Sequence, residues 1–545
     1  MNFDFSIQII SSLIKWGVQE FYICAGARNI PLIEILMQSN ENNIFSHFEE
    51  RSASFYALGR IKSIKKPVAI IVTSGTAAGE LLPAVMESYY SSLPLVIVTS
   101  DRPKKYRGTG APQTAEQKNL YGSYVSACID IEAHDEFDID FLPRNLPLHI
   151  NACFDIPLQS KKIIDFKNVF DFKNIKFNSF IFESNNFNSD INLLLDFLNN
   201  SKNVLVIVSK VNEDEMNAIT PFLLLLNFPV YLESISNLRE CELLNKIKIL
   251  SPDKIWKNCE KSCYLIDSIL KIGSTPTHRI WRDLDELKSE IKILSISSNS
   301  FSGSYRAKNI TTNINLFLDK NREILNHSFK RKCDLNILNQ FLSYDKIDYL
   351  KMHELFNKYP LAEQSVIHHI SKEIPNNSRV YLGNSLPIRT WDMAAIYENK
   401  NFLIEASRGL NGIDGQVSTF LGFADSSTEN WAILGDLTTL YDLAGLWAIQ
   451  YKPSLNLNII IINNGGGLIF KGVLSGNAAK FCQNSHAIHF KHWADMWGLE
   501  YEFRNENLNE LNLKKNHFNK NIKRIIEIIP DADETSQFSI DYNKI

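Results

Sequence analysis

The sequence predicts an α/β protein with three doubly wound parallel-sheet domains. Short β-branched runs alternate with helical patterns along the whole chain, which is typical of βαβ units whose strands pair in parallel. The alternation comes in three groups, which two polar segments separate: 165–179 lacks periodicity, and 319–348 is partly basic and weakly helical. We therefore expect domains at 1–180, 181–340 and 341–545, with the two polar segments as connectors.

The individual elements follow from local patterns. Residues 1–17 have apolar side chains at helical spacing and predict a first helix, and further helices are expected at 50–63 and 76–90. In the order of the chain, we expect strands at 21–25, 68–73, 95–100, 204–208, 263–269, 291–297, 379–382, 401–405, 431–434 and 457–462.

Composition and charge exclude several classes of protein. The 545 residues are 45% hydrophobic and 22% charged, and 57 basic against 61 acidic residues give a net charge of −4, which argues against a nucleic-acid-coating protein. No apolar run reaches the length of roughly 18 residues that spans a bilayer. Asp4 stands where a signal peptide would need a basic residue, and the eight cysteines are dispersed. We expect a cytoplasmic enzyme without a membrane or nucleic-acid partner.

Two strand ends in the last group carry oxygen ligands. Gly435 and Asp436 end one strand, and Asn463 and Asn464 end the next, before three consecutive glycines. Ligands of open parallel sheets bind beyond the carboxyl ends of the strands, and Mg²⁺ prefers oxygen donors. A helix that starts at Leu437 would also point its N-terminus at this place and favour an anion. The alternative is two unrelated βα turns.

A pair of carboxylates opens the helix expected at 50–63. Glu49 and Glu50 stand at its N-terminus, where acidic residues usually complement the helix dipole. From position alone the pair needs no further function.

The spacing of Gly435–Asp436 and Asn463–Asn464 resembles the signature of thiamine-diphosphate-dependent enzymes. This resemblance implies that Asp436, Asn464 and the backbone carbonyl of Gly466 bind Mg²⁺, with Mn²⁺ as a possible substitute. It also implies that Glu50 is the catalytic residue that hydrogen-bonds N1′ of the cofactor's aminopyrimidine. Leu437 stands where most such enzymes have glycine.

Longer stretches resemble one branch of these enzymes, the 2-succinyl-5-enolpyruvyl-6-hydroxy-3-cyclohexene-1-carboxylate synthases of menaquinone biosynthesis. The stretches are CAGARNIPL, HFEERSASFYALGRIK, RGTGAPQTAEQ, GNSLPIR, SRGLNGIDGQVST, LGDLTTLYDL and NNGGGLIF. Leu437 is usual in this branch. The resemblance implies a transferase that decarboxylates 2-oxoglutarate and adds the resulting carbanion to isochorismate. It places Ile413 beneath the thiazolium ring and Ile469 and Phe470 along the ring pocket, although each of them would equally suit a core.

The same resemblance assigns polar side chains to the two polyanionic substrates. Guanidinium groups bind carboxylates with two hydrogen bonds, although a single surface arginine is usually only solvated. The residues assigned to the succinyl part are Ser385, Arg389, Arg408 and Gln113. The residues assigned to isochorismate are Arg28, Arg102, Arg279 and, where the family usually has lysine, His278.

Three departures from the family pattern leave the acceptor open. Ala27 replaces serine, Pro112 replaces asparagine, and His278 replaces lysine with an imidazole that we expect to be mostly neutral at pH 7. One alternative is therefore a related decarboxylase and carboligase with another acceptor, and another is a non-catalytic binding paralogue. An FAD-containing acetolactate synthase is disfavoured by the arginines. Since Glu50 and Asp436 lie on different predicted domains, the resemblance also implies a homodimer or homotetramer in which the cofactor bridges two subunits.

Overall fold

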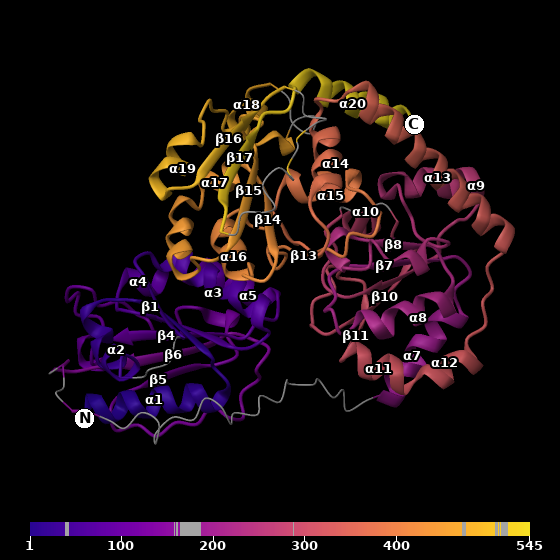
Figure 1. Cartoon of the computed structure of the whole chain (residues 1–545). Helices are drawn as coiled ribbons and strands as arrows, with labels where there is room; N and C mark the ends of the chain where they lie inside the picture. Colours follow the sequence, from indigo (N-terminus) through magenta and orange to yellow (C-terminus); the bar gives the residue numbers. More distant parts are fainter. Residues whose placement is uncertain are drawn as a thin grey trace. The chain divides into compact units, whose positions relative to one another are not determined.

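The computed structural model describes residues 1–38, 43–156, 158–159, 162–163, 187–278, 280–286, 288–470, 476–506, 511, 513 and 521–545. These residues form three sheets, in which all neighbouring strands are parallel and helices flank the strands (Figure 1). The strand orders are β2-β1-β3-β4-β6-β5, β11-β10-β9-β7-β8 and β13-β12-β14-β15-β17-β16. The α/β class with three doubly wound parallel sheets is therefore confirmed.

The chain divides into two compact units. The first contains residues 1–180, 407–426 and 438–455, and the second contains 181–406, 427–437 and 456–545. The second unit thus holds two of the three sheets, and the strands of each sheet come from one of the three ranges that we expected as domains. The exact domain boundaries stay a prediction.

The first unit is built on the sheet β1–β6. Its strands are β1 (Glu20–Cys24), β2 (Ile44–His47), β3 (Val68–Val72), β4 (Leu95–Asp101), β5 (Cys128–Ile131) and β6 (Leu148–Cys153). Its helices are α1 (Asn2–Trp16), α2 (Ile30–Leu36), α3 (Glu50–Ile64), α4 (Thr76–Gly79), α5 (Leu82–Tyr90) and α16 (Gln416–Phe423). The single helix expected at 76–90 is two helices, because Pro83, in the first turn of α5, has no backbone N–H to continue a helix.

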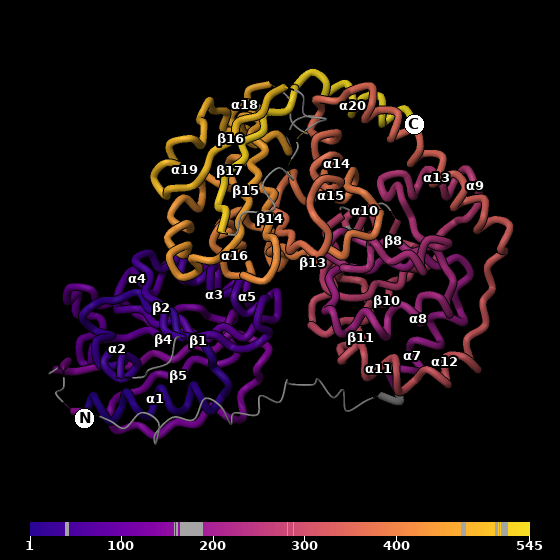
Figure 2. The backbone as a smooth tube through the Cα atoms, in the orientation of Figure 1, coloured from indigo at the N-terminus to yellow at the C-terminus, as the bar shows by residue number. Residues whose placement is uncertain are grey.

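The second unit holds the other two sheets. The strands of the middle sheet are β7 (Val204–Val208), β8 (Val230–Leu232), β9 (Ser268–Ile272), β10 (Lys292–Ser297) and β11 (Lys308–Thr311). Those of the last sheet are β12 (Arg379–Leu382), β13 (Leu403–Glu405), β14 (Glu429–Gly435), β15 (Asn456–Ile462), β16 (Glu500–Arg504) and β17 (Lys523–Ile528). Figure 2 traces the chain through both sheets.

The helices of the second unit flank these two sheets. They are α7 (Phe187–Asn199), α8 (Met216–Leu226), α9 (Ile255–Ser262), α10 (Ile280–Glu286), α11 (Ile314–Lys320), α12 (Arg322–Ser328), α13 (Leu335–Lys358), α14 (Glu363–Glu373), α15 (Leu386–Ala394), α18 (Gly476–Gln483), α19 (Lys491–Trp497) and α20 (Ala532–Lys544). Their buried side chains and those of the strands make separate apolar cores, one of which lies around β12, β14 and β15. The short helix α17 (Asp436–Leu440) begins in the second unit and ends in the first.

One expected strand was wrong. It was expected at 263–269 and starts only at Ser268, because α9 extends to Ser262 and Cys263 then adopts a left-handed conformation. The connector expected at 319–348 as weakly helical is more helical than predicted and includes the residues of the 24-residue helix α13 that come before Tyr349. The other connector, 165–179, lies outside the described residues.

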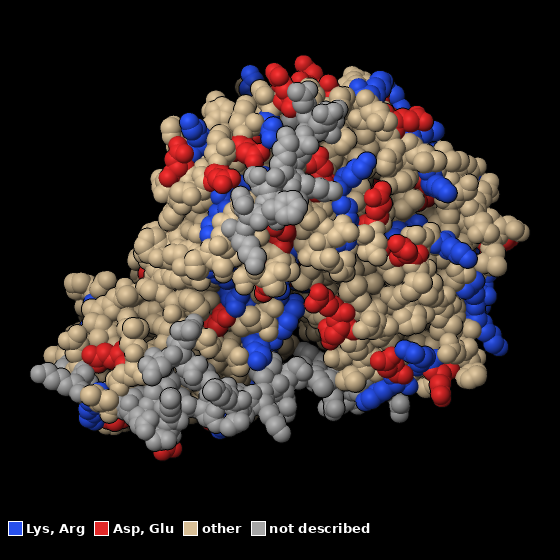
Figure 3. All heavy atoms as spheres, in the orientation of Figure 1, with Lys and Arg blue, Asp and Glu red and all other residues tan. Residues whose placement is uncertain are grey.

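Charge is mixed over the surface. Figure 3 shows basic and acidic side chains interspersed on the visible face, in keeping with the balanced composition. None of the helices in the described part of the chain is long and apolar enough to span a bilayer.

Candidate active site

Asp436 and Asn464 follow two adjacent strands of the last sheet. Gly435 at the end of β14 is in register with Ile462 at the end of β15, so the residues after these strands start from neighbouring positions. The Asp436 carboxylate is buried and accepts backbone N–H groups from Leu437 at 2.6 Å and from Gly466 at 2.9 Å. The structure thus brings Asp436 and the turn Asn463–Gly467 together, as the sequence predicted.

Gly466 makes this close approach possible. Its φ of +141° lies in the left-handed region that side chains disfavour. A Cβ at this position would lie 2.5 Å from the Gln483 carbonyl oxygen, a distance that no real side chain tolerates. Glycine is therefore required here for both reasons.

The donors at these strand ends suit a hard cation. Asn464 Nδ2 donates to Glu363 Oε2 at 3.0 Å, while Asn464 Oδ1 is buried and has no hydrogen-bond partner among the described residues. An unpaired amide oxygen beside a buried carboxylate fits the oxygen preference of Mg²⁺. The described residues contain no cluster of three His, Cys, Asp or Glu side chains suited to a metal, so a cation here would combine the Asp436 carboxylate with amide and backbone oxygens.

The electrostatics of the turn agree with this interpretation. Burial raises the pKa of Asp436, against the hydrogen bonds from Leu437 and Gly466, so a bound cation would compensate its charge. His486 Nε2 lies 3.4 Å from Asp436 Oδ2. The helix that we expected after Gly435 is α17, and it has only five residues, which is too short for a helix dipole to matter much.

Glu49 and Glu50 have different environments. Glu49 is the N-cap of α3, and its carboxylate accepts the backbone N–H groups of Arg51 at 3.0 Å and Ser52 at 2.9 Å. Glu50 is the first residue of the helix, and burial, with the nearby charges of Glu49 and Glu80, raises the pKa of Glu50. The capping function of the pair thus belongs to Glu49, and Glu50 is left for another one.

Arg28 and Arg102 lie close together in the first unit and contact neutral oxygens. Arg28 Nη1 donates to the Phe154 carbonyl at 2.8 Å, and Arg102 Nη1 donates to Ser74 Oγ at 2.7 Å and to the Gln113 carbonyl at 2.6 Å. Burial and the neighbouring charge of Arg102 lower the pKa of Arg28. In the described part of the chain, no carboxylate forms an ion pair with either side chain, so both keep their charge for an anion.

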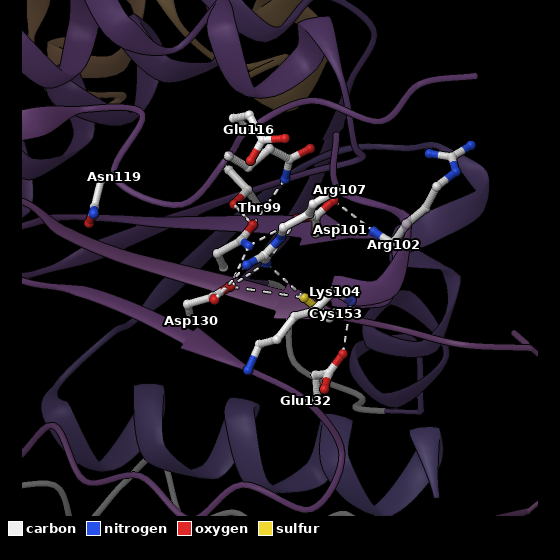
Figure 4. A network of polar contacts seen from close by, with 12 residues as sticks. Thr99, Asp101, Arg102, Lys104, Arg107, Glu116, Asn119, Asp130, Glu132 and Cys153 are labelled. Carbon is white, nitrogen blue, oxygen red and sulfur yellow. Dashed lines mark hydrogen bonds and ion pairs between the residues drawn. The ribbon is translucent and has the colours of Figure 1, made fainter. Parts of the chain in front are cut away.

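Arg107, in the loop Arg102–Gln117 that also carries Arg102 and Gln113, is the centre of a network of polar side chains. Arg107 donates to both carboxylate oxygens of Asp130, at 2.8 and 2.6 Å, and to Asp101 and Cys153 Sγ, each at 3.3 Å. Figure 4 shows Arg107 between these acceptors, while the Arg102 side chain points away from them. Sequence reasoning missed Arg107, although it opens the RGTGAPQTAEQ stretch.

His278 is held by its own unit. Its Nε2 lies 2.8 Å from Asp253 Oδ1, and its backbone N–H donates to Glu233 Oε1 at 2.8 Å. Burial lowers the pKa of His278, but the hydrogen bond and charge of Asp253 more than offset this, and the pKa of His278 is raised. The expectation of a mostly neutral ring did not foresee Asp253, because that residue is 25 positions away in sequence.

Of the other predicted residues, Ser385 and Arg389 lie at the start of α15 and on it, and Arg408 and Ile413 lie in the segment between β13 and α16. Ser385, with φ +76°, precedes α15, and Arg389 is on that helix, whose Asp392 accepts the backbone N–H of Ser234 at 2.8 Å. Arg408 and Ile413 follow β13, where Glu87 accepts the N–H groups of Gly409 and Leu410 at 2.9 and 2.8 Å.

The last three predicted site residues are Ile469, Phe470 and Arg279. Ile469 is partly buried in a short 3₁₀ turn, Leu468–Phe470, and only the backbone of Phe470 is described. Arg279 lies outside the described residues.

Comparison with known proteins places these observations in a family context. A sequence model described as "Thiamine pyrophosphate enzyme, N-terminal TPP binding domain" matches residues 4–120. The chain is 37% identical to the 2-succinyl-5-enolpyruvyl-6-hydroxy-3-cyclohexene-1-carboxylate synthase of Bdellovibrio bacteriovorus, over 99% of both chains. It is 32% identical to the protein of that name from Akkermansia muciniphila over 98% of both chains, and 29% identical to that from Lysinibacillus sphaericus over 98% of this chain and 96% of the relative.

Proposed function

The chain belongs to the family of 2-succinyl-5-enolpyruvyl-6-hydroxy-3-cyclohexene-1-carboxylate synthases, thiamine-diphosphate-dependent enzymes of menaquinone biosynthesis, and we propose that it decarboxylates 2-oxoglutarate and transfers the remaining succinyl group to isochorismate. The observation that carries the proposal is the pair of oxygen donors at the ends of β14 and β15. The buried Asp436 carboxylate and the unpaired Asn464 Oδ1 offer what a cation bound to a diphosphate requires.

The chain's own residues hold the cofactor in this proposal. Asp436, Asn464 and the Gly466 carbonyl bind Mg²⁺ or Mn²⁺, while Gly435 and Leu437 approach the diphosphate and Ile413, Ile469 and Phe470 contact the rings. When bound, thiamine diphosphate supplies the nucleophilic carbon and the electron sink for decarboxylation. Glu50 would hold a proton against N1′ of the aminopyrimidine, and the burial that raises the pKa of Glu50 supports this function because burial favours the protonated carboxyl.

Positive charge binds the two substrates. Arg28 and Arg102, whose side-chain partners are neutral, bind the carboxylates of the acceptor together with Arg279. The residues that bind the succinyl part of the donor are Ser385, Arg389, Arg408 and Gln113. Paired charge-assisted hydrogen bonds give such sites both affinity and orientation.

We also propose the assembly and location of the enzyme. Glu50 belongs to the first unit and Asp436 to the second, and a homodimer or a homotetramer would let the cofactor contact both from different subunits. The three domains are proposed at 1–180, 181–340 and 341–545. All eight cysteines are unpaired thiols, which supports a reducing compartment such as the cytoplasm.

The replacement of Glu50 by glutamine tests the proposal. Glu50→Gln should still bind thiamine diphosphate with Mg²⁺ but lose turnover by about 10²–10⁴-fold, since an amide cannot carry the proton. The measurement is product formation from 2-oxoglutarate and isochorismate, with cofactor affinity from calorimetry. Glu49→Gln is the matched control, because its amide oxygen can still cap α3 and turnover should change little. Wild-type turnover in Glu50→Gln would refute this assignment.

A second candidate function is the same decarboxylation with a different acceptor. It is favoured by Ala27 and Pro112, and by His278, whose ring hydrogen-bonds Asp253 instead of being left for a ligand. Purified enzyme supplied with 2-oxoglutarate and a panel of acceptors would distinguish the two. Carboligation with isochorismate alone supports the first function, and a clear preference for another acceptor supports the second.

A further inference from the structure

Glu363 is a buried carboxylate that touches two parts of the proposed site without belonging to it. It is the first residue of α14, and only 4% of its surface is exposed. Its Oε2 accepts Asn464 Nδ2–H at 3.0 Å, and its Oε1 accepts the Thr390 hydroxyl of α15 at 3.4 Å. One carboxylate therefore joins the turn after β15 to the helix that carries Arg389.

The chemistry of the two groups fixes the orientation of the Asn464 amide. An ionised carboxylate can only accept hydrogen bonds, and an amide offers one donor end and one acceptor end. Asn464 turns its nitrogen toward Glu363 Oε2, at 3.0 Å, so its Oδ1 takes no part in that contact. That oxygen is buried and has no hydrogen-bond partner in the described ranges.

Glu363 is itself held firmly. Its backbone N–H donates to Thr535 Oγ1 at 2.9 Å, and the nearby Leu361 N–H donates to Glu534 Oε2 at 2.8 Å, so α20 fixes the start of α14. A carboxylate on a fixed helix terminus can orient a neighbouring amide with little freedom.

We propose that Glu363 is a positioning residue that orients the Asn464 amide so that Oδ1 faces the divalent cation. The inference rests on the proposed cation site and adds to it a residue that contacts a ligand of the cation but not the cation itself. Groups that orient metal ligands typically affect metal affinity by about 10–100-fold. Through Thr390, in the middle of α15, the same carboxylate also links the helix that carries Arg389 to the turn.

The proposal also explains why position 464 carries an amide and not a second carboxylate. An aspartate in place of Asn464 would set an acceptor against the acceptor Glu363, close to the further carboxylate Asp436. A glutamine in place of Glu363 would restore a donor toward that aspartate. The pair can therefore be exchanged between Glu–Asn and Gln–Asp.

The experiment measures binding of Mn²⁺ by the full-length protein in the presence of thiamine diphosphate, by calorimetry and by electron paramagnetic resonance. Glu363→Met, which removes the acceptor, should weaken Mn²⁺ affinity by about 10–100-fold, and Glu363→Gln, which keeps an amide oxygen for Asn464, should change it by less than about threefold. Asn464→Asp should also weaken affinity by at least about tenfold, and Asn464→Asp combined with Glu363→Gln should recover most of that loss.

Two controls separate the possible failures. Asp345→Leu removes another buried carboxylate of the same unit, one that accepts the N–H groups of Leu250 and Ser251. It should lower the melting temperature without changing Mn²⁺ affinity. Asp436→Ala tests the cation site itself, and unchanged affinity in that variant would overturn the proposed site.

If Asp436→Ala loses affinity while Glu363→Met binds Mn²⁺ like the wild type, the cation site stands and the function of Glu363 is refuted. Should Glu363→Met fail to fold, the exchange decides, because both of its variants keep a polar side chain at 363. An exchanged pair that binds no better than Asn464→Asp alone would overturn the inference.

Discussion

Arg102, in the loop Arg102–Gln117 of the first unit, and His278, in the segment Thr277–His278 of the second, were both expected to bind the acceptor, yet the two places use positive charge differently. In the loop, Arg107 pairs with Asp130 and Asp101, whereas the Arg102 guanidinium contacts only neutral oxygens among the described residues. In the segment, the only titratable side chain described, His278, lies 2.8 Å from the Asp253 carboxylate.

This difference shows which cations can attract an anion. A cation that already faces a carboxylate offers little net charge, whereas one held by hydroxyl and carbonyl oxygens keeps its full charge. Arg107 and His278 therefore hold the chain in place, and Arg28 and Arg102 are the groups suited to a polyanionic acceptor. The partner of each cation, a carboxylate or a neutral oxygen, and not its residue type, distinguishes a structural cation from one that can bind an anion.

The largest expected effect concerns Arg107. Arg107→Leu removes the cation from between two buried carboxylates, and a broken buried pair of this kind costs about 3–5 kcal/mol of unfolding free energy. Chemical denaturation with urea measures the loss. Arg107→Lys keeps the charge but not the paired hydrogen bonds to Asp130. Its unfolding free energy should therefore lie between those of the wild type and Arg107→Leu.

A surface arginine provides the matched control for this change. Arg322 pairs with Asp319, and both side chains are more than half exposed, so Arg322→Leu should cost about 1 kcal/mol or less. Equal losses in Arg107→Leu and Arg322→Leu would contradict the structural function of Arg107.

Arg102 should show the opposite pattern, with a smaller change that appears in binding. Arg102→Ala should weaken acceptor affinity by about 1.5–3 kcal/mol, because a charge-assisted hydrogen bond is lost, and should leave the unfolding free energy almost unchanged. Acceptor titration in the presence of 2-oxoglutarate measures the first quantity, and urea denaturation measures the second. If Arg102→Ala destabilises the fold as much as Arg107→Leu, the distinction between the two arginines fails.

Sequence patterns predicted the buried strands well because those strands are continuous apolar runs. β7 and β12 have the predicted bounds, and β3 differs by one residue. The helix α13 was predicted only as part of a weakly helical connector, for a specific reason. Its buried face includes Leu338, Phe341, Asp345, Asp348, Met352 and Leu355, and the two aspartates interrupt the apolar periodicity. They are buried because they accept hydrogen bonds from Leu250, Ser251 and Asn258.

The candidate site shows the same limit. Strand ends and glycines indicated Asp436 and Asn464, since neighbours in a parallel sheet end at one edge. Glu363 and Arg107 could not be found, because their functions depend on partners 101 and 23 residues away. Nothing local distinguishes a buried carboxylate that orients an amide from one exposed on a helix.

The smallest expected effect concerns Asp253 and depends on pH. Because the pKa of His278 is raised in the folded protein, the charged imidazole stabilises the fold at pH values below about 6.5, the ordinary histidine pKa. This stabilisation is lost as the pH rises through the folded-state pKa. Asp253→Asn removes its cause, so the variant should lose about 1 kcal/mol or less at pH 6, since the Asp253 side chain is 36% exposed. The hydrogen bond that the Ile280 N–H donates to His278 Nδ1 favours the neutral ring and keeps the effect small.

Urea denaturation of the wild type and of Asp253→Asn at pH 6 and pH 9 measures the difference in unfolding free energy, which should shrink at the higher pH. Acceptor affinity should stay the same in Asp253→Asn at both pH values. A gain in isochorismate affinity would instead show that the freed imidazole contacts the acceptor and that His278, like Arg102, offers its charge to the ligand.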